Sequence, residues 1–216
     1  MLTAIAGWVD AIGFISVGGF YVSFMSGNTT QLGIGLTRFD LELVRLPAIL
    51  LVCFVVGAFL GTIVTSLSGR WNLPRILLLE ALLLLGALLL SFVTTPMLGA
   101  AEPLAIAMGA QNAALRNDSG GRIGGTFVTG TVFGLGENLA LWCLRREGVR
   151  PALRHAMGWL ALAAGAAAGT WAFSAYGLNA LSAPAGTLLV LALATGGMTL
   201  RERTDFAAEK GGDEPA

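Results

Sequence analysis

Long apolar runs alternate with short polar stretches along this chain. Runs at 46–67, 76–93, 159–173 and 180–200 reach or approach the roughly 20 residues that a helix needs to cross a bilayer. Other apolar regions are interrupted by glycine and polar residues. This pattern predicts an all-α polytopic membrane protein.

The interrupted regions resemble each other. One carries the sequence VDA and then SGNT, and the other carries QNA and then TGT. Aligned by residue type, Asp10 corresponds to Asn112, and Ser26-Gly27 corresponds to Thr129-Gly130. A polar, glycine-broken segment in each half of an apolar chain is the best sequence indication of a transporter's central binding site.

The resemblance continues outside these segments. Gly57 is matched by Gly165, and Pro74 by Pro184. The offset between matched residues is 102 at Asp10, 108 at Gly57 and 110 at Pro74, a slow drift that loop insertions would produce. We therefore predict an internal duplication, with a first repeat at 1–95, a second at 103–200 and a tail at 201–216.

Each predicted repeat contains one broken segment and then two plain helices. The first repeat has these at 2–37, 46–67 and 75–94, and the second at 103–143, 156–173 and 180–200. If each broken segment crosses once, each repeat has three spans, and the second repeat is inverted relative to the first. The alternative is that the charged stretch 116–122 reaches water, which gives eight spans in two parallel repeats of four.

Basic residues distinguish the two sides of the membrane. With six spans, the loops 68–75 and 144–154 and the C-terminal tail share one side and hold most of the Lys and Arg, whereas Arg38 and Arg45 lie on the other. Cytoplasmic loops carry such an excess. We predict a bacterial inner-membrane protein with both termini cytoplasmic and a disordered tail.

Composition narrows the class further. The chain is 55% hydrophobic, 12% charged and has a net charge of 0, which excludes a soluble domain and argues against nucleic acid as a partner. Cys53 and Cys143 lie in apolar segments, so we expect no disulfide. His155 is the only histidine and lies in an arginine-rich loop, so we expect neither a metal site nor a cofactor. Apolar sequence begins at Leu2, which predicts no ordinary signal peptide and either a truncated start or a short first helix.

Glycine pairs mark close helix contacts in both halves. Gly57 and Gly61 form a GxxxG motif, and so do Gly165 and Gly169. Small residues at this spacing let helix backbones approach each other. We expect these contacts to lie within one chain, although the sequence leaves a homodimer open.

The broken segments predict helices that begin inside the membrane. Residues 20–24 are β-prone, and Ser26 or Asn28 suits the N-cap of a helix running to Leu36. Such a helix start favours an anion or a polar solute. The expected substrate-binding residues are Asp10, Ser26, Gly27, Asn28, Thr29, Gln111, Asn112, Thr129, Gly130 and Thr131.

Acidic residues within spans are candidates for proton or ion coupling, because an ionisable group there is costly. We select Asp10 and Glu137, with Glu80 as a third candidate. The structural alternatives are that Asp10 caps or pairs locally and that Glu137 lies near the membrane interface.

At residues 7–11, 25–29, 111–113 and 126–131 the chain resembles the bacterial YoaK-type family. That family is uncharacterised, so the resemblance implies a multi-span inner-membrane protein and little chemistry. Ser26 stands where the family more often has Thr, which keeps the hydroxyl. More faintly, a β-like stretch leading into a Thr-Gly half-helix is similar to the central repeats of sulfate and nucleobase permeases.

These features together predict a permease for a small solute, with the lipid bilayer and a small molecule or ion as its partners. The alternative is a membrane scaffold or sensor that transports nothing. An enzyme is disfavoured, because Phe24 stands where the similar rhomboid-protease motif has glycine, and a His-Glu-x-x-His motif does not occur.

Overall fold

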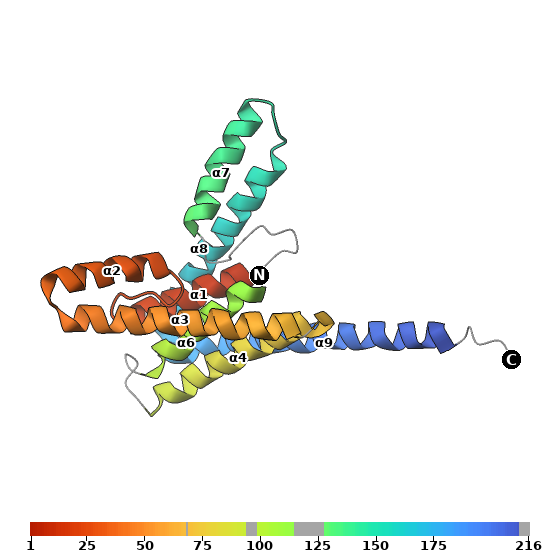
Figure 1. Ribbon diagram of the computed structural model, residues 1–216, viewed down its shortest axis with the longest axis horizontal. Helices are drawn as coiled ribbons and strands as arrows, with labels where there is room; N and C mark the ends of the chain where they lie inside the picture. Colours follow the sequence, from red (N-terminus) through yellow and green to blue (C-terminus); the bar gives the residue numbers. More distant parts are fainter. Residues whose placement is uncertain (68, 94–98, 115–127, 212–216) are drawn as a thin grey trace.

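The computed structural model describes residues 1–67, 69–93, 99–114 and 128–211 of the chain. All regular secondary structure in these residues is helical (Figure 1). The predicted all-α class is therefore confirmed. The stretch 116–122, on which the choice between six and eight spans depends, lies outside the described residues.

The first half of the chain forms a broken helix, a long helix and a returning helix. The broken helix consists of α1 and α2, separated by residues 17–24, and Figure 1 shows α2 folding back along α3. Asp40 caps the N-terminus of α3, because its Oδ1 accepts the Glu42 and Leu43 N–H groups at 3.1 and 3.2 Å. The helices are α1 (Leu2–Ser16), α2 (Met25–Arg38), α3 (Leu41–Leu67), the 3₁₀ turn Gly69–Trp71 and α4 (Asn72–Ser91).

The second half has the same order of short and long helices. Its α9 continues to Gly211, so residues 201–211 are helical where the sequence predicts a disordered tail. The described helices are α6 (Ala101–Ala114), α7 (Val128–Cys143), α8 (Arg150–Tyr176), the 3₁₀ turn Gly177–Leu181 and α9 (Ser182–Gly211).

Helices from the two halves of the chain pack against each other in the centre of the bundle. The main pairs are α3 with α6, α1 with α8, and α4 with α9 and α6. Figure 1 shows α1 running opposite to α3 and α6. Large side chains from several of these helices are fully buried between them, among them Ile12, Leu50, Leu77, Leu104 and Leu188. At the periphery, α2 packs along α3 and α7 packs along α8.

Glycine allows the tight approach of α3 to α6 and of α1 to α8. A Cβ added to Gly61 would lie 2.8 Å from the Ala110 carbonyl oxygen, and one added to Gly169 would lie 2.7 Å from that of Trp8. A Cβ on Gly57 would collide with the Ile106 carbonyl. Both GxxxG motifs therefore make contacts within the chain, as the sequence predicts.

These glycine contacts recur at matching positions of the two predicted repeats. Gly57 contacts Ile106 and Gly165 contacts Ala4, so the glycines differ by 108 and their partners by 102. The contacts of Gly61 and Gly169 are related by the same two offsets. The recurrence of these contacts agrees with a duplication, whereas the inversion of the second repeat is inferred from the sequence.

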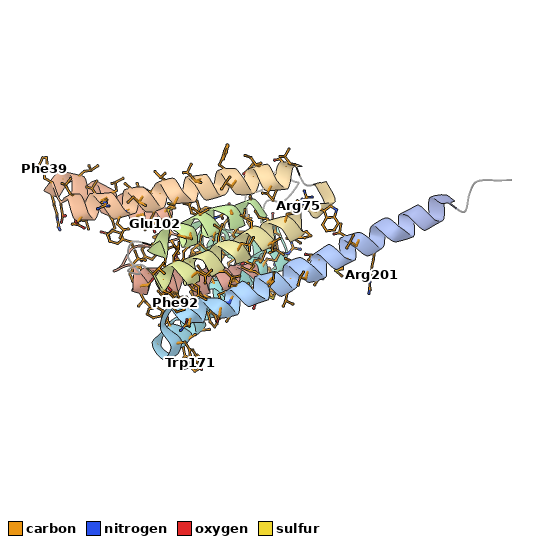
Figure 2. All side chains as sticks on the ribbon, turned by 90° about the horizontal axis from the view of Figure 1, so that it is seen from below. Phe39, Arg75, Phe92, Glu102, Trp171 and Arg201 are labelled. Carbon is orange, nitrogen blue, oxygen red and sulfur yellow. The ribbon has the colours of Figure 1, made fainter. Side chains whose placement is uncertain are left out.

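The outer surface of the bundle is apolar. Among the described residues, three helical stretches are long and apolar enough to cross a membrane: Leu41–Leu67, Asn72–Ser91 and Arg150–Arg201. On α3, Val52, Val55, Phe59 and Ile63 recur at helical spacing and are exposed. Figure 2 shows Phe92 and Trp171 likewise on the outside. Such a surface requires a lipid environment.

Candidate functional site

Asp10 fixes the linker between the two pieces of the broken helix. It lies on α1, and its Oδ1 accepts the backbone N–H groups of Val22 at 3.1 Å and Ser23 at 2.8 Å. Asp10 is half-buried. The Asp10 carboxylate therefore accepts hydrogen bonds from the backbone. This is the local pairing that the sequence indicated as the alternative to a role in proton or ion coupling.

Asn28 holds the same linker from the other side. Its Oδ1 accepts the Tyr21 N–H at 3.0 Å, and its Nδ2 donates to the Tyr21 carbonyl at 2.6 Å. Asn28 is fully buried. The side-chain amide thus replaces the neighbouring strand that a β-prone segment would otherwise need, and residues 17–24 form turns and bends.

The helix start at α2 differs from the prediction. The N-cap is Phe24, and Ser26 and Asn28 both lie in the first turn. The Gly27 and Asn28 N–H groups donate to the Phe24 carbonyl at 3.1 and 3.4 Å. The predicted N-cap role of Ser26 or Asn28 is wrong, because α2 begins at Met25, before both residues, and the side chain of Asn28 bonds to Tyr21 instead.

Gly27 accommodates aromatic rings. A Cβ at this position would lie 2.7 Å from a ring atom of Phe24 and 3.0 Å from one of Tyr21. Tyr21 stacks at an angle on Phe14, with ring centroids 4.7 Å apart, and meets Phe24 edge-on at 5.1 Å. This cluster was not predicted from the sequence, although three aromatic residues flanking a glycine-rich break indicate it.

The outward side of α2 carries hydroxyl groups. The α2 hydroxyl face consists of Ser26, Thr29, Thr30 and Thr37, all of them exposed. Thr29 and Thr30 donate to the carbonyls of Met25 and Ser26 at 2.8 and 3.1 Å. Their donors are satisfied within the helix, so their oxygen lone pairs face outward.

The second half places its hydroxyl residues at the start of α7. Thr129 and Gly130 are exposed and Thr131 is half-buried. Because α2 packs on α3 and α7 on α8, Ser26 and Thr129 belong to different helical hairpins (Figure 1). The polar break before α7, at 115–127, lies outside the described residues.

The remaining predicted residues lie in different surroundings. Asn112 is half-buried, and its Nδ2 donates to the Met108 carbonyl at 2.8 Å within its own helix. Gln111 is fully buried and bonds to Glu80 at 2.7 Å. Glu137 is exposed on α7.

His155 also differs from the prediction of a solvated loop residue. It belongs to α8 and is half-buried, because its ring lies against Gly134 of α7, where a Cβ would be 2.6 Å from the ring. Within the described residues, no group of three or more His, Cys, Asp or Glu side chains could hold a metal ion.

The fold and its surface define a polytopic membrane protein. The chain matches the DUF1275 family, described as a protein of unknown function, over residues 1–194. It is 34% identical over 201 residues to the UPF0700 transmembrane protein RA0705 of Rhizobium meliloti (strain 1021), which covers 89% of this chain and 82% of that relative. The chain therefore belongs to the DUF1275 family. No solved structure matches it.

Membership in this family confirms the resemblance to an uncharacterised multi-span membrane protein family. It assigns no activity, so any function has to be argued from the residues themselves.

Proposed function

We propose that this protein is a permease for a small, anionic or polar solute, and that the solute binds at the polar starts of α2 and α7. The observation that carries the proposal is the α2 hydroxyl face, where Ser26, Thr29, Thr30 and Thr37 gather four exposed hydroxyl groups on one side of one helix. Facing lipid, the oxygen lone pairs of these hydroxyl groups would lose the hydrogen bonds that they accept from water. Such a face is favourable where it lines a path for water and solute.

The linker supports this proposal because it positions the start of α2. Asp10 and Asn28 hold residues 21–23 through four hydrogen bonds. A helix start fixed in this way presents the positive end of its dipole beside the hydroxyl of Ser26. Hydroxyl groups next to a helix N-terminus can bind an anion without a basic side chain.

The start of α7 is proposed as the second element of the same site. Thr129 and Gly130 are exposed there, as Ser26 is on α2, and the two helices begin matching segments of the predicted repeats. Ser26 and Thr129 belong to different helical hairpins, α2–α3 and α7–α8. Movement of one repeat against the other would change the distance between them and give alternating access to the solute.

The proposal can be tested with the full chain in proteoliposomes. Currents would be recorded on a solid-supported membrane after concentration jumps of phosphate, sulfate, and mono- and dicarboxylates. We expect at least one anion to give a saturable current. Replacing Ser26 with Ala together with Thr30 with Val should weaken apparent affinity about tenfold, because two hydrogen-bonding groups are lost.

Thr187→Val is the matched control. Thr187 is an exposed threonine on α9 whose hydroxyl donates to the Ala183 carbonyl at 2.8 Å, as the hydroxyls of α2 do to theirs. The control should keep the wild-type current. Solute binding without current would favour the sensor alternative, and an absence of both binding and current across the panel would refute the permease.

A further inference from the structure

A buried carboxyl–amide pair lies between α4 and α6, away from the polar helix starts. Gln111 Nε2 donates to Glu80 Oε1 at 2.7 Å. Both side chains are fully buried. Gln111 Nε2 also lies 3.4 Å from the Leu2 carbonyl oxygen, so the pair joins α4 and α6 to the beginning of α1.

Two oxygen atoms of this pair have no hydrogen-bond donor in the described part of the chain. Glu80 Oε2 and Gln111 Oε1 are both buried and have no partner among the described residues. An ionised carboxylate would keep its charge here with a single hydrogen bond, and breaking or omitting the partner of a buried charge is strongly unfavourable. Two unpaired acceptor oxygens on neighbouring side chains can be satisfied by one shared hydrogen-bond donor, and a positively charged donor would also offset the charge of the carboxylate.

No surrounding charged group supplies that donor within the described part of the chain. Arg75 lies on α4 roughly 7.5 Å along the helix from Glu80, and Figure 2 shows Arg75 and Arg201 toward one end of the bundle and Glu102 toward the other. Glu80 Oε2 is hydrogen-bonded to none of them. Of the residues whose side chains the structure describes, the titratable and charged ones on Glu80's own helix, on the helices packed against it and on α1 are Met1 (amine), Asp10, Glu42, Arg45, Cys53, Arg75, Glu102 and Arg201.

We propose that Glu80 and Gln111 form a proton-binding site. A proton taken from water converts the Glu80 carboxylate to a carboxylic acid, with the new O–H bond at Oε2. The acid has no net charge, and its O–H can donate to Gln111 Oε1 while Gln111 Nε2 continues to donate to Glu80 Oε1. One proton thus satisfies both unpaired oxygens and removes the buried charge.

A metal ion fits this place less well than a proton. Hard cations take six or more oxygen ligands, and this site offers the unpaired oxygens of Glu80 and Gln111 with the Leu2 carbonyl nearby. The surrounding positions are apolar, including Leu77, Ala81 and Met108. A proton needs only one oxygen to bind and one to accept its hydrogen bond.

The site lies where a movement of helices would expose it. Glu80 belongs to α4 and Gln111 to α6, so separating these helices breaks the pair and lets water reach the carboxyl group. Release of the proton would then accompany opening of the interface. This coupling role rests on the proposed permease function, whereas proton binding itself does not.

Infrared spectroscopy of the full chain in lipid bilayers tests the site directly. The carbonyl stretch of a protonated carboxylic acid is separate from the bands of a carboxylate. We expect this band at neutral pH in the wild type and its loss in Glu80→Gln. That variant should fold, because its new amide can donate to Gln111 Oε1. Gln111→Ala removes the partner and should shift the frequency of the band.

Two other carboxyl groups serve as controls. Glu102→Gln removes another carboxyl group, one of whose oxygens is buried and has no partner among the described residues. Glu137→Gln removes an exposed carboxyl group. Both should keep the band that Glu80→Gln loses. A wild-type spectrum without that band would overturn the proposal, and stabilisation by Na⁺ or K⁺ that disappears in Glu80→Gln would replace the proton with a metal ion. A band with neither solute binding nor solute current would refute the permease and leave the proton site standing.

Discussion

At the scale of residues, polar side chains in this apolar chain satisfy backbone groups of an irregular segment. Asp10 accepts the Val22 and Ser23 N–H groups, and Asn28 binds both polar groups of Tyr21. Both residues were predicted to be important because they are polar and lie in a glycine-broken segment of an apolar chain. Their partners were not predictable, because the bonds join positions 7 to 13 residues apart through a linker without a regular period.

Replacing Asp10 should separate its structural role from its charge. Asp10→Ala leaves the Val22 and Ser23 N–H groups without their acceptor and should destabilise the protein by about 2 kcal/mol. Asp10→Asn keeps an oxygen at the same position and should cost less than half of that. Thermal unfolding of the purified protein in detergent measures both. Equal losses for the two variants would show that the charge of Asp10, not its acceptor oxygen, stabilises the fold.

Gly27 gives a second test at this scale. Gly27→Val would force the rings of Phe24 and Tyr21 away from α2 and should lower the melting temperature as well as any solute affinity. Gly33→Ala lies on the same helix with nothing within 4 Å of the added Cβ. This control should be neutral or slightly stabilising, because alanine favours the helix. If Gly27→Val lost affinity and kept the melting temperature, Gly27 would instead be needed for close approach of the solute.

At the scale of elements, hydrophobic runs were good predictors of the plain helices. The run at 46–67 lies within α3, which begins at Leu41, and the run at 180–200 lies within the 3₁₀ turn and α9. Helix ends were less predictable. The hydrophobic pattern does not predict the early start of α3, which is capped by Asp40. It also does not predict the extension of α9 to Gly211, because these last turns are polar.

Helix pairs joined by glycine should be the most sensitive elements to added volume. Gly57→Ala and Gly165→Ala each place a Cβ against a backbone carbonyl of the facing helix, at Ile106 and Ala4. Backbone cannot rotate away as a side chain does, so each variant should cost about 1–3 kcal/mol. Gly86→Ala on α4 meets nothing within 4 Å and should stabilise by up to about 1 kcal/mol.

Thermal unfolding of the same three variants provides the measurement. If the predicted repeats are equivalent, Gly57→Ala and Gly165→Ala should lower the melting temperature by similar amounts. A large loss at one glycine with none at the other would contradict the equivalence of the two interfaces.

At the scale of the whole molecule, the sequence did not predict which helices pack against each other. Small-residue motifs indicated that close contacts exist, but not that α3 would meet α6 and α1 would meet α8. A hydrophobic pattern gives each helix an apolar face without naming its partner. The pairing of Glu80 with Gln111 was hidden for the same reason, since each residue alone was visible as a polar interruption.

The orientation of the whole molecule can be tested by cysteine labelling. In a background without Cys53 and Cys143, single cysteines would replace Leu41 and Arg150, and intact cells would be treated with a membrane-impermeant maleimide. Leu41 is 81% exposed and Arg150 is also exposed, so labelling depends on the side of the membrane and not on burial. The excess of arginine near 150 predicts that position 41 is labelled from outside and position 150 only after the cells are opened. Labelling of 150 in intact cells, with 41 protected, would reverse the orientation and place both predicted termini outside.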